Sequence, residues 1–163
     1  MRDQHSILLL QELHPKVSPD FQNAIEEVEN VFNLTVRIIE AYRPWEKQAA
    51  YYAIGRTVKG ENASPDHPMG DIITNAPPGS GYHLYRIAAD IGVLKSDGEI
   101  DYNYDYSKWA NIFAQYNISW GGNFPRKFKD YDHWENRLGH TWHDLLPLYQ
   151  ANKFIQGTQF LDI

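Results

Sequence analysis

The sequence of 163 residues contains no cysteine. This absence excludes disulfide bonds, iron–sulfur clusters, thiolate zinc sites and cysteine nucleophiles. Any bound metal ion must therefore be held by histidine, by carboxylate or carbonyl oxygens, or by water. Seven histidines and 21 Asp and Glu residues supply such groups.

The chain also lacks a long hydrophobic run and an excess of positive charge. Near the N-terminus the apolar run extends only from Ile7 to Leu10, which is too short for the core of a signal peptide or for a membrane span. We therefore expect synthesis in the cytoplasm without a signal peptide, and no membrane insertion. The net charge of -6 and the absence of a basic run argue against a nucleic-acid partner.

Hydrophobic residues make up 42% of the chain, and aromatic residues reach 14%, with five Trp and eleven Tyr. This length and composition predict one folded domain over residues 1–163, with a hydrophobic core and no internal repeat. We expect a monomer. The many aromatic side chains fit a recognition surface and a filled core equally well.

The order of predicted elements indicates an α+β fold with a small, mostly antiparallel sheet flanked by helices. Apolar periodicity and capping residues predict helices over residues 18–32, 44–55 and 107–116, and a last helix that begins with a capping box at Thr141 to Asp144. Alternation and β-branched residues predict strands over residues 34–41, 82–93, 118–120 and 132–135. Residues 56–80 are predicted to form a long loop with a short strand at 71–74. Loops of this length are usually functional.

His83 and Asp90 are polar residues within the apolar run PPGSGYHLYRIAADIGV. Burial of either group without a partner is unfavourable by several kcal/mol, and a shared metal ion would explain both. On a regular strand they would lie about 23 Å apart on opposite faces. The segment must therefore bend between them if they bind the same ion.

A second cluster lies in the segment FKDYDHWE, where Asp130 and His133 are three residues apart and Asp132 and Glu135 stand beside them. A metal-binding histidine and a carboxylate that orients water are a productive pair. A solvated acidic loop, with His133 packed against an aromatic neighbour, explains the same residues equally well.

His140 and His143 form a third pair, with the spacing of neighbours on one helix face. Because they lie at the start of a predicted helix, capping and solvation explain them better than metal binding.

Three separated segments together resemble a known family: AYRPWEKQAAYYAIGRT, then TNAPPGSGYHLYRIAAD, then SWGGNF followed by FKDYDHWE. The chain is similar here to the zinc-dependent L-alanyl-D-glutamate peptidases of phage endolysins, which are related to D-alanyl-D-alanine carboxypeptidases and vancomycin-resistance dipeptidases. The resemblance covers residues 42–135 and leaves 136–163 as a C-terminal helical tail. It implies the fold shared by hedgehog proteins and D-alanyl-D-alanine peptidases.

The resemblance assigns a role to each matched residue. By this resemblance His83, Asp90 and His133 bind Zn²⁺, Asp130 is the catalytic carboxylate and Arg43 holds the substrate carbonyl. From the residues alone, Arg43 would be read as a surface arginine.

Three further residues are candidates for substrate binding: Gln48, Ser80 and Trp120. Gln48 follows the arginine on the same helix of the family, and Trp120 begins the family's Trp-Gly-Gly segment. The motif departs from the family at two positions. Gly81 replaces a serine, although Ser80 is adjacent, and Arg86 replaces a glycine and could alter the local bend or the substrate groove.

The resemblance implies hydrolysis of the L-alanyl–D-glutamate bond of peptidoglycan, with a role as a phage endolysin that reaches the wall from the host cytoplasm. One alternative is the same zinc chemistry on a D-alanyl–D-alanine bond. An alternative of another class is a zinc-containing protein that binds the wall without hydrolysing it. Asp130 and Arg43 argue against this last alternative.

Overall fold

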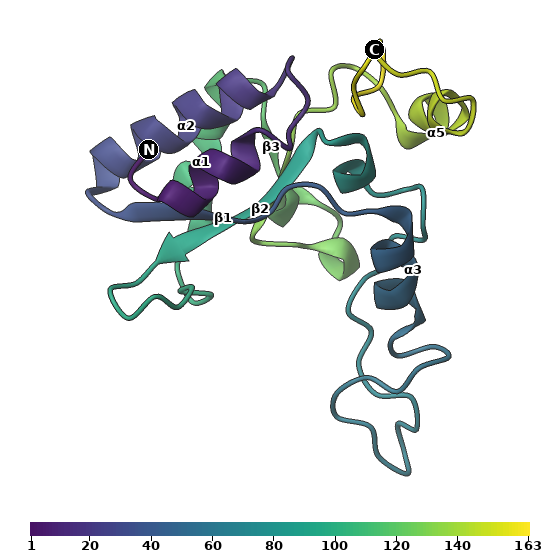
Figure 1. The fold of residues 1–163 in the computed structure, drawn as a ribbon. Helices are drawn as coiled ribbons and strands as arrows, with labels where there is room; N and C mark the ends of the chain where they lie inside the picture. The colour runs from purple at the N-terminus through teal and green to yellow at the C-terminus, as the bar shows by residue number, and fades with distance from the viewer.

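The computed structural model describes all 163 residues and contains a four-stranded antiparallel sheet with helices around it (Figure 1). The strands follow the spatial order β1-β2-β4-β3, and every neighbouring pair is antiparallel. Their bounds are Thr35–Glu40 for β1, Ala88–Leu94 for β2, Ser119–Trp120 for β3 and His133–Glu135 for β4. The expected α+β class is confirmed.

Helices α1 and α2 lie over one face of the sheet, whereas α3 lies at one end and leads into a long loop that extends away from the sheet (Figure 1). None of the helices combines the length and the apolar character of a transmembrane span. The α-helices are α1 Gln4–Leu10, α2 Ser18–Phe32, α3 Trp45–Ala53, α4 Ala110–Gln115 and α5 Trp142–Gln150. The short 3₁₀ helices are η1 Tyr82–Tyr85, η2 Tyr106–Trp109, η3 Gly121–Asn123 and η4 Arg126–Phe128.

Helix α2 packs its predicted apolar face into the core. Phe21, Ile25 and Val28 are fully buried, because their spacing places them on one side of the helix. Ser18 is the first helical residue rather than the N-cap, and its hydroxyl donates to the carbonyl of Leu10 instead. This bond ties α2 to the end of α1.

Several predicted elements differ from the structure. The strand expected at 71–74 does not form, and Ile72 and Ile73 are half exposed in the long loop. The sequence does not predict helix α1, because seven residues are too few to show a clear helical period. The helix expected at 107–116 is split into η2 and α4, and Asp105 rather than Ser107 caps its start.

The strand expected at 82–93 is wrong over its first half. Tyr82–Tyr85 form η1, and the chain turns at Arg86, whose φ of 64° lies in the left-handed region, before β2 begins. The bend that shared metal binding requires is therefore present, and it lies at the position where the resemblance implies a glycine.

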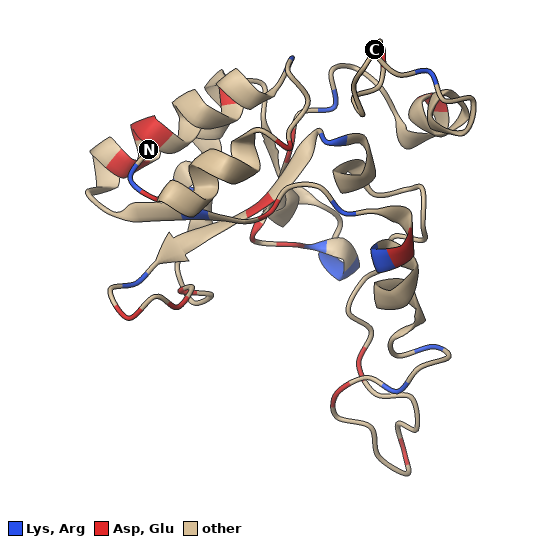
Figure 2. Ribbon diagram, in the orientation of Figure 1, with Lys and Arg blue, Asp and Glu red and all other residues tan.

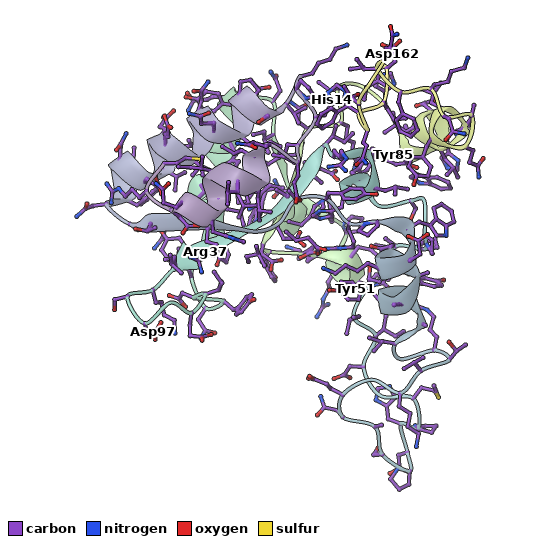
Figure 3. All side chains as sticks on the ribbon, viewed as in Figure 1. His14, Arg37, Tyr51, Tyr85, Asp97 and Asp162 are labelled. Atoms are coloured by element: carbon purple, nitrogen blue, oxygen red, sulfur yellow. The ribbon has the colours of Figure 1, made fainter.

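The Arg86 side chain joins the N-terminal region to the C-terminal segment. Its guanidinium donates to the carbonyl of Glu12 and to Oε1 of Gln159, and it lies 3.7 Å from the ring centroid of Tyr42. His14 lies beside the same segment (Figure 3) and donates from Nε2 to the carbonyl of Leu161. The left-handed backbone is unfavourable for a non-glycine residue by roughly 1–2 kcal/mol, and these buried contacts offset that strain.

Helix α5 begins with the predicted capping box, since Asp144 accepts from the backbone and hydroxyl of Thr141. Pro147 lies inside the helix, which nevertheless continues to Gln150. One backbone hydrogen bond is lost at this proline.

Candidate metal centre and cleft

The pairing of β2 with β4 brings the two predicted metal-binding clusters together. Asp90 lies directly opposite His133 in the antiparallel register. Glu40 pairs with Asp90 on the other side, after a bulge that shifts the β1–β2 register between Ile38 and Glu40. Bulges of this kind re-aim side chains near functional sites. Three polar residues thus lie side by side across three neighbouring strands.

Helix η1 delivers the third metal-binding candidate. His83 Nε2 lies 3.1 Å from Asp90 Oδ1 and 3.1 Å from His133 Nδ1, and the last two atoms are 3.2 Å apart. The three ligand atoms therefore form a nearly equilateral triangle. A tetrahedral zinc ion with ligands at about 2.0–2.1 Å has ligand–ligand separations of about 3.3 Å. The triangle fits such an ion, and a fourth position remains for water or substrate.

Both imidazoles are oriented by hydrogen bonds on their other ring nitrogen. His83 Nδ1 donates to the carbonyl of Ala41 at 2.9 Å, and His133 Nε2 donates to Glu135 Oε2 at 3.1 Å. When the imidazoles are neutral, each bond leaves the lone pair of the remaining nitrogen directed at the triangle, as in known metal centres. The three residues therefore form a group that could bind a metal ion.

The charges of the site depend on one another. Burial disfavours the charged imidazolium, but hydrogen bonds to Asp90 and Glu135 outweigh it and raise the pKa of His133 to about 10. Burial also opposes the ionisation of Asp90, yet the positive charge of His83 and the hydrogen bonds from both histidines hold the pKa of Asp90 well below its ordinary value. Without a metal ion, a proton on His133 thus balances the buried carboxylates.

Arg43 lies in the same cluster and is largely engaged by carboxylates. Its Nε donates to Glu40 Oε2 at 2.8 Å, its Nη2 contacts Glu40 Oε2 and Asp90 Oδ2, and its Nη1 donates to Gln48 Oε1 at 3.2 Å. A guanidinium has five N–H groups, so one N–H on Nη1 remains. That group is free for a substrate oxygen.

The cleft beside the triangle has a volume of about 610 Å³. The residues that line this cleft include two triangle residues and four other predicted site residues: His83, His133, Arg43, Gln48, Ser80 and Asp130.

Gln48 and Ser80 contribute to one side of this cleft. Gln48 is buried and its Nε2 donates to the carbonyl of Ala76 at 2.7 Å, which ties Arg43 to the long loop. The Ser80 hydroxyl donates to the carbonyl of Pro77. A Cβ added at Gly81 would meet Gln48 Oε1 at 3.8 Å, an ordinary contact. The family's serine would therefore fit at Gly81.

Trp120 is not among the residues that line this cleft. Its indole N–H donates to the carbonyl of Tyr131 at 2.7 Å, and so supports the loop that carries Asp130. Its role in substrate binding remains a prediction. His140 and His143 do not belong to the metal-binding group.

Asp130 is exposed at the cleft and is positioned by the glycine pair that follows Trp120. The backbone N–H of Asp130 donates to the carbonyl of Gly121 at 3.2 Å. A Cβ at Gly121 would lie 2.4 Å from the carbonyl oxygen of Asp130 and 3.0 Å from Cβ of His133. Only glycine permits this approach, which brings the backbone of Asp130 close to His133.

Asp132 stands behind Asp130. Burial, a hydrogen bond with Asp130 and the negative charge of Asp90 raise the pKa of Asp132 to about 8. The carboxyl of Asp132 therefore holds its proton more tightly than an ordinary aspartate.

Glu135 has no role in the candidate metal centre that the sequence alone predicts. Glu135 is 2% exposed and hydrogen bonds to both His133 and Arg137. The alternation of a strand places His133 and Glu135 on the same face, and this signal was available in the predicted strand at 132–135. The carbonyl of Ala41, in contrast, carries no sequence signal.

Comparison with known proteins identifies the family to which this chain belongs. The family model described as D-alanyl-D-alanine carboxypeptidase matches residues 74–136. The peptidoglycan L-alanyl-D-glutamate endopeptidase CwlK of Bacillus subtilis (strain 168) is 32% identical over 134 residues, which cover 76% of this chain and 73% of CwlK. The chain belongs to the D-alanyl-D-alanine carboxypeptidase family of peptidases and is a peptidoglycan hydrolase.

Solved structures share the fold. The L-Ala D-Glu endopeptidase ChiX of Serratia marcescens superposes with a TM-score of 0.58 at 17% identity, over 88% of this chain and 91% of ChiX. The vancomycin-resistance D,D-pentapeptidase VanY, solved in complex with Zn(II), gives a TM-score of 0.55 at 14% identity, over 76% of this chain and 72% of VanY. The expected peptidase fold is confirmed.

We predict that Glu135→Gln weakens zinc binding by about 10- to 100-fold. The amide can still accept from His133 but no longer adds negative charge to the imidazole. Zinc affinity is measured by competition with a chelator. Glu99→Gln, at an exposed position of the turn after β2, is the matched control. Equal zinc affinity in the Glu135 variant and the control would exclude an orienting role for this carboxylate.

We also predict that zinc affinity increases with pH between 6 and 9. The pKa of His133 is raised from 6.5 to about 10 in the metal-free protein, so its proton must leave when the metal binds. Each pH unit below 10 therefore weakens binding. Affinity is measured at constant buffer and ionic strength over this range. Zinc affinity that is constant above pH 7.5 would contradict the raised pKa.

Proposed function

We propose that this chain is a zinc-dependent endopeptidase that cleaves the L-alanyl–D-glutamate bond of peptidoglycan stem peptides. The observation that carries the proposal is the triangle of His83, Asp90 and His133 beside a cleft that also presents Asp130 and Arg43. The identity to CwlK, named for this bond, favours it over other peptidoglycan bonds.

The three triangle residues would hold the zinc ion. When bound, zinc supplies a Lewis acid and lowers the pKa of bound water toward about 7. Glu135 and the carbonyl of Ala41 keep the two imidazoles oriented for this task.

Asp130 is the base and acid of the proposed reaction. It is exposed at the cleft and has no ion-pair partner, so its carboxylate is available to take a proton from the attacking water. It then passes the proton to the leaving amine of D-glutamate as the peptide bond breaks.

Arg43 stabilises the carbonyl oxygen of the substrate. Arg43 lines the cleft next to Gln48, and one N–H on Nη1 has no partner within the chain. Negative charge develops on this oxygen during attack, and a preorganised cation lowers the barrier. The contacts of Arg43 with Glu40 and Asp90 hold the guanidinium in place.

Product analysis of digested peptidoglycan tests the proposal. We expect new N-terminal D-glutamate on the released peptides, with L-alanine left on the glycan. Release of terminal D-alanine alone would instead identify a D,D-carboxypeptidase, the alternative favoured by the description of the matched family. A metal-loaded protein that sediments with purified wall without hydrolysing it would identify a binding protein.

We further propose that the enzyme acts as a phage endolysin and as a monomer. The motif order shared with the phage enzymes supports the first point. The expected result is that bacteria producing the protein remain intact until their membrane is permeabilised, and then lyse. Light scattering of the purified protein tests the second point, and a dimer mass would overturn it.

A further inference from the structure

The cleft contains two cations that no protein carboxylate neutralises. Arg43 and Arg137 also line the cleft, but each forms ion pairs with acidic residues of the chain. Lys127 and Lys129 line the same cleft, are exposed and form no ion pair. The chain has a net charge of -6. Two lysines without an ion-pair partner, next to the candidate catalytic carboxylate, therefore indicate an anionic ligand.

Both lysines lie close to Asp130. Lys129 directly precedes it, and Lys127 belongs to η4, whose basic residues lie opposite α3 in Figure 2. The Lys127 carbonyl accepts from Asn75 Nδ2 at 3.5 Å, so η4 contacts the loop residues that line the other side of the cleft. The lysine pair therefore stands on the side of the cleft where Asp130 would protonate the leaving amine.

The chemistry of the substrate places an anion at the same position. In a γ-linked D-glutamate, a single α-carbon bears both the nitrogen of the scissile bond and a carboxylate. When Asp130 lies at that nitrogen, the carboxylate lies within reach of side chains next to Asp130. Charge-assisted hydrogen bonds between ammonium and carboxylate groups are stronger than neutral ones.

We propose that Lys127 and Lys129 bind the α-carboxylate of the D-glutamate on the leaving side of the scissile bond. The inference rests on the proposed function and specifies its substrate preference. The enzyme prefers stem peptides whose D-glutamate has a free α-carboxylate over peptides in which this carboxylate is amidated. Amidation removes the negative charge and leaves the scissile bond unchanged.

Two soluble peptides test the inference: N-acetylmuramyl-L-alanyl-γ-D-glutamyl-L-lysine and the same peptide with D-isoglutamine. The zinc-loaded enzyme is expected to cleave the glutamate peptide with a kcat/KM about tenfold or more above that of the isoglutamine peptide. In the double variant Lys127→Gln, Lys129→Gln, the ratio is expected to fall to near one, through loss of activity on the glutamate peptide alone.

Lys59→Gln is the matched control, since Lys59 is exposed in the long loop and does not line the cleft. It should keep the wild-type ratio. Equal kcat/KM values of the wild type on the two peptides would overturn the inference. An unchanged preference for the glutamate peptide in the double variant would also overturn it. A double variant that loses activity on whole walls but keeps the peptide ratio would assign the lysines to attraction by wall polyanions, which also overturns it.

The failure of the proposed function gives a different result. In that case neither peptide is cut between L-alanine and D-glutamate. Failure of the inference alone leaves both peptides cut at this bond at equal rates.

Discussion

Asp130→Asn is expected to lower kcat on peptidoglycan by about 100- to 10,000-fold and to leave the zinc content at one ion per chain. The amide has the same shape as the carboxylate but cannot take a proton from water. Asp130 is not part of the metal-binding triangle, and its side chain is exposed. The substitution should therefore change neither metal binding nor stability.

The measurement separates kcat from KM on a soluble stem peptide. A fall in kcat with little change in KM is the signature of a group that acts in the chemical step. Asp97→Asn, at an exposed turn, is the control. A variant that loses both zinc and activity would place Asp130 in the metal site, and a variant with wild-type kcat would remove it from the reaction.

Substitution of any triangle residue by alanine is expected to abolish activity together with zinc binding. His83→Ala, Asp90→Ala and His133→Ala each leave two protein ligands, and we expect zinc affinity to fall by more than about 100-fold. Elemental analysis after dialysis gives the zinc content, and hydrolysis of purified wall gives the activity.

Asp90→Ala has a further consequence, because Arg43 Nη2 loses one of its two carboxylate partners. Circular dichroism therefore accompanies each variant to show that the fold is retained. His143→Ala is the control, since this histidine is exposed and stacks on Trp142 outside the triangle. Stoichiometric zinc in all three triangle variants would overturn the metal assignment.

The residue types of the centre could be predicted because a buried imidazole or carboxylate needs a partner. His83 and Asp90 stand out in an apolar run for this reason, and helix α2 and the capping box of α5 follow from local patterns. The same local patterns predicted β1 and β4 within a few residues.

The 82–93 segment shows where local pattern fails. Its apolar residues favour a continuous strand, yet Tyr82–Tyr85 form a 3₁₀ helix and Arg86 adopts a left-handed conformation. That conformation is stabilised by contacts with Glu12, Gln159 and Tyr42, which are distant in sequence. No window of neighbouring residues contains this information.

The sequence by itself determined which ligands are available: without cysteine, any metal ion that this chain binds must be held by nitrogen and oxygen ligands. Only the tertiary structure decided that these ligands meet. The β2–β4 register sets Asp90 opposite His133, and the bend at Arg86 returns His83 to the same point. Composition reports which groups need a partner, whereas long-range strand pairing and packing determine which partner each group receives.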